Sequence, residues 1–339
     1  MVRKSILEKY KQFKKIETED LKIAKKVKKK IISRYGAINN FLDKLQYNIL
    51  NTPKSKEFKS IYNLYKKIFT LPEEQESYEG FEEVLGFNQD AKLRKKFGFF
   101  EEAWIYAQDP DTEKIIGAVN FSTYQMPKSI KRKYNLDGTN HTIYLFVKPE
   151  YRKIGLGKRL LEIMINYSKL RLEGKKTLTG TSNKKLYIIC EQNAPEMMTL
   201  NEYIKDNLNA RIDQCDRLIW WHKIGYRRLG FRYLQPALNK SLDPCTSLTL
   251  NIYIKSKKNI PSIVVLEHLK RFFEISVLKK QDITKDESYK LQYAELTSVK
   301  SIPKIHDPNF AAMKTKIHKF LVNNGRGIDL NKSLGDFLK

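Results

Sequence analysis

The sequence predicts an α/β protein built on a mixed sheet, and three parts of the chain carry that prediction. Residues 142–171 begin with an apolar run rich in β-branched and aromatic residues, continue through a turn with two glycines, and end in apolar residues at helical spacing. Upstream, residues 103–121 read as two apolar runs joined by an Asp-Pro-Asp turn, which is typical of a β-hairpin. Downstream, residues 186–190 and 248–254 have the composition of strands. Strands and helices in this order predict a mixed sheet covered by helices.

The composition indicates a globular protein of a reducing compartment. Hydrophobic residues make up 41% of the 339 residues, which is sufficient for a packed core. No run approaches the roughly 20 apolar residues of a membrane span, and the first residues are not followed by the apolar core of a signal peptide. Cys190, Cys215 and Cys245 are odd in number and lack Cys-x-x-Cys spacing, so neither a disulfide framework nor a metal site is indicated. We therefore expect a cytoplasmic protein without a metal.

The chain is strongly basic. Its 64 Lys and Arg residues against 38 Asp and Glu residues give a formal charge of +26. Such a balance indicates an acidic partner, which would be nucleic acid, an anionic membrane surface or an acidic protein. A genome that favours lysine codons would produce the same excess without any partner. Lysine is spread through nearly every segment of the chain, so we give the two explanations equal weight.

Residues 1–52 are expected to form a basic, helical N-terminal extension. The first 50 residues hold 14 Lys and Arg residues against 5 Asp and Glu residues, a net charge of +9. Apolar residues recur every three to four positions, which predicts helices with one apolar face, and the acidic residues 17–20 indicate a break and a second helix start. This extension is interpreted as a helix pair docked on the core, as an arm that binds a polyanion, or as a helix on a membrane surface.

Residues 53–255 are expected to form the main domain, and residues 256–339 a helical C-terminal extension packed on it. Within the main domain, the patterns predict helices, loops and strands around the central strand, turn and helix. In chain order these are a helix at 58–69, a helix from Phe81, the hairpin, a polar insertion at 126–139, a basic loop at 175–185, a polar linker, a helix at 213–223, a turn at Gly225-Tyr226, and strands at 228–238 and 248–254.

The glycine turn at residues 152–158 has the features of an anion site. Glycine lets the backbone approach a ligand closely, and the first N–H groups of the following helix have no partner within the helix. Those donors and the positive end of the helix dipole favour a phosphate or pyrophosphate. The turn reads Arg152-Lys153-Ile154-Gly155-Leu156-Gly157-Lys158.

This turn resembles motif A of the GNAT superfamily of acyl-coenzyme A-dependent N-acyltransferases. That motif has arginine or glutamine, two variable residues, glycine, one variable residue, and glycine or alanine, between a strand and a helix. Here the matching residues are Arg152, Gly155 and Gly157. Residues 213–254 resemble motif B, and the Y-x-Q-P-x-L element at 233–238 resembles a less-studied bacterial branch. The resemblance covers about residues 55–305 and implies a GNAT fold with helical extensions at both ends.

The resemblance implies an enzyme that transfers an acetyl group from acetyl-coenzyme A to a primary amine by direct attack in a ternary complex. Small amines, aminoacyl conjugates and protein lysines all fit as acceptors. In the family, the turn holds the pyrophosphate, and the end of the preceding strand pairs through its backbone with the pantetheine arm and polarises the thioester carbonyl. The implied co-substrate-binding residues are Leu145, Phe146, Val147, Arg152, Lys153, Ile154, Gly155, Leu156, Gly157 and Lys158.

Two residues are candidates for the catalytic base. Glu191 follows the second central strand, where substrates meet in the GNAT sheet, and a carboxylate there could take a proton from an ammonium. Alternatively, Glu191 binds a cationic substrate or caps a loop. His141, just before the central strand, is a rival because imidazole titrates near neutral pH, although a lone histidine at a loop edge is more often structural.

The acid that protonates the thiolate is a second open question. The family uses a tyrosine five positions before the phenylalanine of a Gly-Phe pair. If Gly225-Tyr226 is the equivalent pair, that position is Trp221; if Gly230-Phe231 is, it is Tyr226. We favour Trp221, because Gly225 ends the helical pattern, and water or another residue would then serve as the acid. The missing tyrosine also motivates an alternative function, a catalytically weak basic module that binds nucleic acid or an acidic protein.

Overall fold

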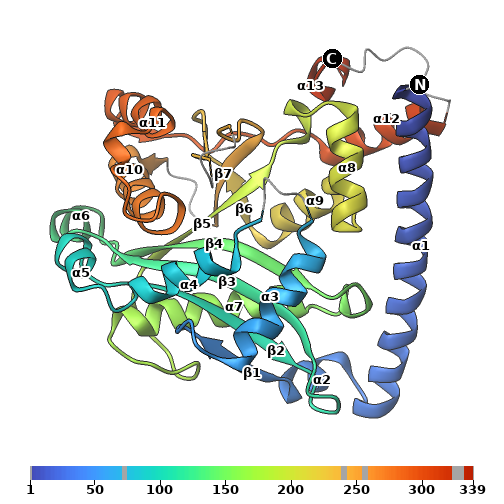
Figure 1. Cartoon of the computed structure of the whole chain (residues 1–339), viewed down its shortest axis with the longest axis horizontal. Coiled ribbons are helices and arrows are strands. Elements are labelled where there is room, and N and C mark those ends of the chain that lie inside the picture. Colours follow the sequence, from blue (N-terminus) through green and yellow to red (C-terminus); the bar gives the residue numbers. More distant parts are fainter. Residues whose placement is uncertain (1, 71–74, 238–242, 254–258, 323–331, 339) are drawn as a thin grey trace.

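A mixed sheet forms the centre of the molecule. The computed structural model describes residues 2–70, 75–237, 243–253, 259–322 and 332–338 (Figure 1). Within them, a seven-stranded sheet has the order β1-β2-β3-β4-β5-β7-β6, in which β4 and β5 are parallel and all other neighbours are antiparallel. The strands are β1 Gln46–Leu50, β2 Phe100–Gln108, β3 Ile115–Gln125, β4 Gly138–Val147, β5 Leu186–Asn193, β6 Tyr226–Arg228 and β7 Leu248–Tyr253. The predicted α/β fold with a mixed sheet is confirmed.

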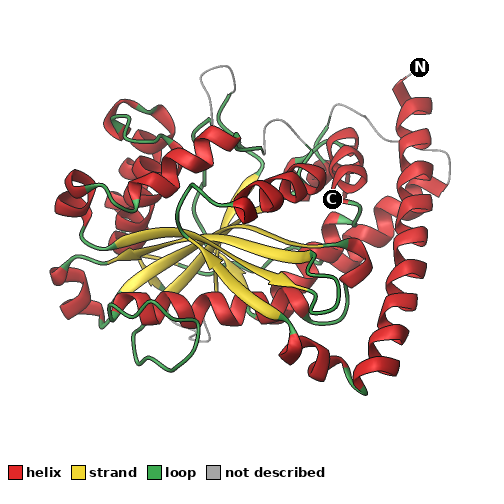
Figure 2. Cartoon of the chain, turned by 60° about the horizontal axis from the view of Figure 1, so that its bottom comes forward, coloured by secondary structure: helices red, strands yellow, loops and turns green. Residues whose placement is uncertain are grey.

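Helices cover both faces of this sheet (Figure 2). Successive residues of a strand point to opposite faces, and β2 shows the consequence. Its alanines and Ile105 pack with α7 (Leu156–Leu172) on one face, whereas Trp104 and Tyr106 pack with α3 (Lys56–Ile68) and α4 (Tyr78–Phe87) on the other. The short helices α5 (Ala91–Phe97) and α6 (Lys128–Tyr134) lie in the segments before β2 and before β4.

The N-terminal extension is docked on the body of the protein. It consists of α1 (Val2–Tyr35) and α2 (Ile38–Lys44), followed by β1. Helix α1 contacts α8, α2 and the turn before α7. Its buried residues lie on one face of the helix and are Ile6, Phe13, Asp20, Ala24 and Ile31. The structure therefore shows the first of the three interpretations, in which the N-terminal helices are docked on the core. Across the described residues, no helix combines the length and the apolarity that crossing a membrane requires.

Two expectations about this extension were wrong. The acidic residues 17–20 do not break the helix, because Glu17 pairs with Lys14 and the Thr18 hydroxyl donates to the Lys14 carbonyl at 2.7 Å, both along one helix. Asp20 is buried and forms a bidentate ion pair with Arg211. Residues 46–50, expected to belong to the helical extension, are strand β1 and pair with β2. The short length of β1 and its mixed polarity gave no strand signal.

A helical cluster joins the two ends of the chain. The polar linker expected before α9 contains a helix, α8 (Leu200–Ala210), which begins with a capping box of Thr199 and Glu202. The hydrophobic side chains of α8 pack with α9 (Gln214–Ile224), α12 (Phe310–Val322), α13 (Leu334–Leu338) and the start of α1. Figure 1 shows α8, α9, α12 and α13 on the side of the molecule where α1 begins. The linker prediction was wrong because the Thr-x-x-Glu signature was overlooked.

The C-terminal extension packs on the sheet beside β5 and β7. It contains α10 (Ser262–Arg271), a π-helical turn (Phe272–Val277) that continues α10, and α11 (Glu287–Ser298). Its apolar side chains form one cluster with Ile189, Leu250 and Ile252 of the sheet. A two-stranded ribbon of β8 (Ile260–Pro261) and β9 (Ser301–Ile302) connects the start of this extension with its end.

The strand predicted at 228–238 is mostly absent from the described residues. Strand β6 ends at Arg228, and the chain then leaves the sheet. Gly230 packs against Pro303 so closely that an added Cβ would lie 3.1 Å from the proline side chain, and its N–H donates to the Pro303 carbonyl at 2.8 Å. Leu238 and Ile254, which were included in predicted strands, lie outside the described residues.

The docking of α1 predicts that its buried aromatic residue is a major source of stability. The Phe13 side chain is fully buried. Replacing it in Phe13→Ala should lower the free energy of unfolding by about 3–5 kcal/mol, because the side chain loses its contacts and leaves a cavity. The matched control, Lys15→Ala, changes an exposed residue of the same helix and should alter it by less than about 0.5 kcal/mol. Urea denaturation measures both, and equal small effects would show that α1 is not docked in solution.

Candidate active site

The candidate site lies where β4 and β5 separate. The two strands pair in parallel from Gly138 and Leu186 to Thr142 and Cys190. Beyond this point β4 continues beside β3 alone, and β5 continues beside β7 alone. A bulge accompanies the separation: Thr142 pairs with Phe121 and Tyr144 with Asn120, so Ile143 is the extra residue. Among the described residues, the edge of β4 that faces β5 has no strand partner at 145–147, and backbone groups at such an edge are available to a ligand.

A cavity of about 450 Å³ passes through this gap. Its walls come from three regions: the face under α4 and the π-helical turn, the separated ends of β4 and β5, and the pair α8–α9. The residues that matter below are Phe81, Glu102, Phe272 and Ser276 from the first region, Ile143, Tyr144, Leu145 and Glu191 from the second, and Gln214, Arg217, Leu218 and Trp221 from the third. Such a concave, mostly apolar site with a few polar groups is the usual form of a substrate site.

Glu191 extends from β5 into this cavity and is held by three neighbours. Tyr233 donates a short hydrogen bond to its Oε1, and Gln235 Nε2 donates to its Oε2 at 3.3 Å. Burial, with the negative charge of Glu191, raises the pKa of Tyr233 well above its ordinary value, so the phenol stays protonated and remains a donor. The third neighbour is His141, whose Nε2 lies 3.7 Å from Glu191 Oε2. Tyr233 and Gln235 belong to the Y-x-Q-P-x-L element.

The two predicted catalytic residues thus lie side by side, and a third residue extends the group. His141 is fully buried, and its Nδ1 lies 2.9 Å from Nε2 of His268 on α10. His268 Nδ1 lies 2.8 Å from the Thr139 hydroxyl. Phe272 stacks on the His141 ring with centroids 3.7 Å apart. Burial, with His141 and Arg271 nearby, lowers the pKa of His268 well below its ordinary value, so His268 is neutral at pH 7.

His268 was missed by sequence reasoning. It lies far along the chain in a helix that belongs to the C-terminal extension, and its spacing from His141 in sequence carries no signal. Only the packing of α10 on the sheet brings the two imidazoles together.

The glycine turn has the backbone form expected of an anion site. Lys153 and Gly155 have φ values of 64° and 89°, in the left-handed region, and the turn leads directly into the N-terminus of α7. Gly155 is the N-cap, and no side chain among the described residues caps the helix there. Ile154 and Leu156 are buried and anchor the turn, whereas Lys158 is exposed. The first N–H groups of α7 therefore remain available to an anion.

Arg152 is bound to backbone carbonyl groups on two sides of the glycine turn. Its guanidinium donates to the carbonyls of Val147 at 3.3 Å, Arg211 at 2.9 Å and Ala210 at 3.1 Å. Burial lowers the pKa of Arg152 to about 10, so it remains charged at neutral pH. The side chain therefore ties the glycine turn to the C-terminal end of α8, where a cation is favoured by the helix dipole.

The remaining predicted residues lie along β4 and at the end of α9. Leu145 lines the cavity, Phe146 is buried in the α3–α4 core, and Leu145, Phe146 and Val147 pair with β3 on one side only. Gly225 ends α9 with a φ of 114°, as the helical pattern predicted, and Trp221 of this helix lines the cavity. Tyr226 is buried in the core beside α7.

Glu102 of β2 is a cavity residue that the sequence did not single out. Its side chain is 3% exposed and accepts hydrogen bonds from Ser122 at 2.9 Å, Ser276 at 3.0 Å and Asn120 at 3.4 Å. Burial raises the pKa of Glu102 from its ordinary value of 4.5 to about 7, and Glu76 adds to the rise, although the three hydrogen bonds oppose it. The sequence signal that could have identified Glu102 is a carboxylate residue within an apolar strand.

Comparison with known proteins gives a family match for part of the chain. Residues 58–187 match the model of the acetyltransferase (GNAT) family. No curated protein matches the sequence.

The ribosomal-protein-S18-alanine N-acetyltransferase from Escherichia coli is 12% identical, covers 63% of this chain and 99% of its own, and has a TM-score of 0.33. A mosquito arylalkylamine N-acetyltransferase like 5b is 12% identical over 61% and 99%, with a TM-score of 0.35. Arabidopsis thaliana NAA60 in complex with acetyl-CoA is 13% identical over 62% and 99%, with a TM-score of 0.31. At these values, the likenesses carry no argument about an acceptor.

The raised pKa of Glu102 predicts how stability changes with pH. A carboxyl group whose pKa is higher in the folded than in the unfolded state binds more protons when folded, so folding becomes less favourable as the pH rises between the two values. With values of 4.5 and about 7, the free energy of unfolding should fall by about 3 kcal/mol across that window. Glu102→Gln should remove this fall.

Urea denaturation at about pH 5 and about pH 8 measures the effect. Glu79→Gln, a change of an exposed carboxylate on α4, is the matched control and should keep the wild-type dependence. An unchanged fall in the Glu102→Gln protein would contradict the assignment.

Proposed function

We propose that this chain, which carries a GNAT acetyltransferase domain, transfers an acetyl group from acetyl-coenzyme A to a primary amine in a ternary complex. The observation that supports the proposal is the cavity that passes between β4 and β5 with Glu191 on its wall. A cavity with access along an unpaired strand edge allows a thioester and an amine to meet directly, which converts a bimolecular step into an oriented one.

The residues present fit acetyl-coenzyme A. The uncapped N-terminus of α7 and the positive-φ turn at 153–155 suit a pyrophosphate, and exposed Lys158 adds a positive charge nearby. The unpaired edge of β4 at 145–147 would hold the amide groups of the pantetheine arm by backbone hydrogen bonds, and an N–H there would polarise the thioester carbonyl. Bound in this way, acetyl-coenzyme A supplies the activated acetyl group.

Glu191 is proposed as the base. It accepts a proton from the substrate ammonium, the freed amine nitrogen forms a C–N bond with the acetyl carbon, and the C–S bond breaks. The second proton that the nitrogen loses passes to the departing thiolate by way of water, because Trp221 cannot donate it usefully. Tyr233 and Gln235 hold the Glu191 carboxylate in position by hydrogen bonds, and the His141 ring lies next to it. The atoms of the amine and thioester are thus all accounted for.

The histidine pair supports this role for Glu191. In the tautomer in which Thr139 donates to His268 and His268 donates to His141, the His141 proton is on Nε2. This nitrogen lies 3.7 Å from Glu191 Oε2 and forms no hydrogen bond in the structure. In the other tautomer, His141 donates to His268 and His268 donates to Thr139, so His141 Nε2 presents a lone pair to Glu191. That arrangement suits a protonated Glu191 carboxyl group. His141 and His268 therefore act as positioning residues that adapt to the charge of Glu191, and both lie outside the reach of the substrate.

One observation favours a second candidate function. Trp221 occupies the position where the family has its tyrosine acid, as expected for a module with weak catalysis. Such a module would bind nucleic acid or an acidic protein through the exposed lysines of α1, which include Lys25, Lys28 and Lys29. Binding of acetyl-coenzyme A and its turnover distinguish the two functions.

Titration with acetyl-coenzyme A by calorimetry tests the binding step. The wild-type protein should bind, and Gly157→Glu should not, because a carboxylate at the turn repels the pyrophosphate and its side chain meets Trp220, which lies 3.4 Å from an added Cβ. Gly86→Glu on α4 is the matched control, since an added Cβ there meets nothing within 4 Å. Absence of binding to the wild-type protein would reject the enzyme function and favour the second candidate.

Replacing Glu191 tests the chemical step. Glu191→Gln should lower kcat for acetyl transfer by about 10²–10⁴-fold, the usual contribution of a general base, while the affinity for acetyl-coenzyme A stays unchanged. Steady-state kinetics with both proteins checks this. Glu79→Gln serves as the control. A variant with wild-type kcat would exclude Glu191 as the base.

A further inference from the structure

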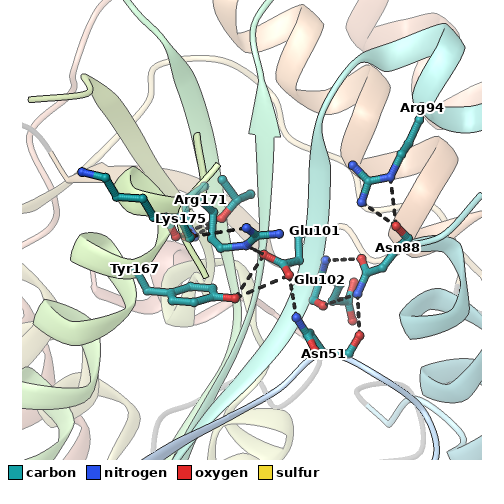
Figure 3. A network of polar contacts seen from close by, with 11 residues as sticks. Asn51, Asn88, Arg94, Glu101, Glu102, Tyr167, Arg171 and Lys175 are labelled. Atoms are coloured by element: carbon teal, nitrogen blue, oxygen red, sulfur yellow. Dashed lines mark hydrogen bonds and ion pairs between the residues drawn. The ribbon is translucent and has the colours of Figure 1, made fainter. Parts of the chain in front are cut away.

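Two adjacent glutamates of β2 have opposite surroundings. Glu101 points to the α7 face, where Arg171 Nε donates to it at 2.6 Å and Asn51 Nδ2 at 2.7 Å, with the Tyr167 hydroxyl at 3.3 Å (Figure 3). Its buried charge is therefore neutralised by a buried arginine. Glu102 points to the other face, toward the cavity.

Glu102 has hydrogen bonds but no cation. Its partners are two hydroxyls and one amide, from Ser122, Ser276 and Asn120. Within the part of the chain that the structure describes, no lysine, arginine or histidine forms an ion pair with it. A carboxylate that is buried without a cation costs several kcal/mol, whereas a buried pair regains much of that cost. The three hydrogen bonds offset only part of this cost, and a ligand cation in the cavity would offset more of it.

Glu191 is the second carboxylate of the cavity without a lysine or arginine partner among the described residues; its neighbours are Tyr233, Gln235 and the imidazole of His141. Of the other acidic residues of the cavity wall, two are neutralised by the protein itself: Lys279 donates to Glu76 at 2.7 Å, and Arg217 pairs with Asp206. Glu202 is exposed to solvent and accepts hydrogen bonds from Thr199. Glu102 and Glu191 are therefore two largely buried carboxylates that face one space without a lysine or arginine partner among the described residues.

The register of the sheet sets the separation of the two carboxylates. Glu102 pairs with Ser122, Ser122 with His141, and His141 with Ile189, so these residues form one row across β2, β3, β4 and β5 on one face. Glu191, two residues beyond Ile189, points to the same face. Three strand spacings of about 4.8 Å and two residues of about 3.3 Å along β5 put the two backbones roughly 16 Å apart. Both side chains line the cavity. Phe81 and Phe272 lie on the wall of the same cavity.

We propose that the acetyl acceptor is an aliphatic diamine or polyamine whose reacting nitrogen lies at Glu191 and whose second ammonium binds Glu102. This inference rests on the proposed function and names its substrate class. One ammonium supplies the cation that Glu102 lacks, an aliphatic chain suits the aromatic wall, and the other ammonium is placed where the thioester arrives. Cation–aromatic attraction adds to the binding of both charged ends. The C-terminal extension takes part directly, because Phe272 and Ser276 belong to its π-helical turn, a form often found at functional sites.

Matched amines test the proposal. Acetyl transfer is measured for putrescine, cadaverine and hexamethylenediamine, and for butylamine, pentylamine and hexylamine, which share their chains but lack the second nitrogen. The best diamine should have a kcat/KM at least about tenfold above that of its monoamine, the size of effect that a charged hydrogen bond gives. Glu102→Gln should lower this ratio about tenfold, Glu102→Asp should keep most of it, and Glu79→Gln, remote from the cavity, should keep all of it.

A binding measurement keeps the test independent of turnover. Calorimetry with hexamethylenediamine should detect binding to the wild-type protein and to Glu102→Asp, and none to Glu102→Gln, whose folding is checked by circular dichroism. If diamines and monoamines are acetylated equally well, or if Glu102→Gln leaves the ratio unchanged, the proposal is overturned while the acetyltransferase function stands. If no amine is acetylated although acetyl-coenzyme A binds, the proposed function fails and this proposal fails with it.

Discussion

The separation of β4 from β5 after Thr142 and Cys190 is the feature on which the rest of the site depends. Parallel neighbours normally satisfy each other's backbone groups, and a pair that parts leaves donors and acceptors that only a ligand or water can satisfy. The bulge at Ile143 allows β4 to diverge while it stays bonded to β3. Because β5 remains bonded to β7, Glu191 is held on one side of the gap and the β4 edge on the other. The cavity follows from this geometry.

The two extensions stabilise this gap from opposite sides. At the glycine turn, Arg152 binds the end of α8, and Arg211 at that end pairs with Asp20 of α1. The long basic helix is thereby connected to the turn that would hold the pyrophosphate. On the other side, the C-terminal extension supplies His268 behind His141 and the Phe272 and Ser276 side chains of the cavity wall. Although both segments look like additions to a smaller domain, each contacts the site.

What could be predicted from the sequence was local. The strand, glycine turn and helix at 142–171 are a contiguous pattern, and Glu191 and His141 were chosen because they flank the central strands. His268 and Glu102 could not be chosen in this way, because their importance comes from packing between segments more than 100 residues apart in the chain, such as the 2.9 Å contact of His268 with His141. The helix break predicted at 17–20 is absent for a reason that is partly local: Glu17 and Thr18 contact Lys14 within the helix, and the tertiary ion pair of Asp20 with Arg211 adds to these contacts.

Net charge and site charge are independent properties of this protein. A dication gains nothing from a surface of formal charge +26, but at physiological ionic strength exposed charges are screened beyond about 8 Å. Inside the cavity the effective dielectric constant is lower and screening is weaker, so each of the two uncompensated carboxylates acts strongly over short distances. The proposed selection of a cationic acceptor therefore rests on Glu102 and Glu191, although Lys205 and the paired Arg217 also line the cavity. The basic surface remains free to serve another purpose or none.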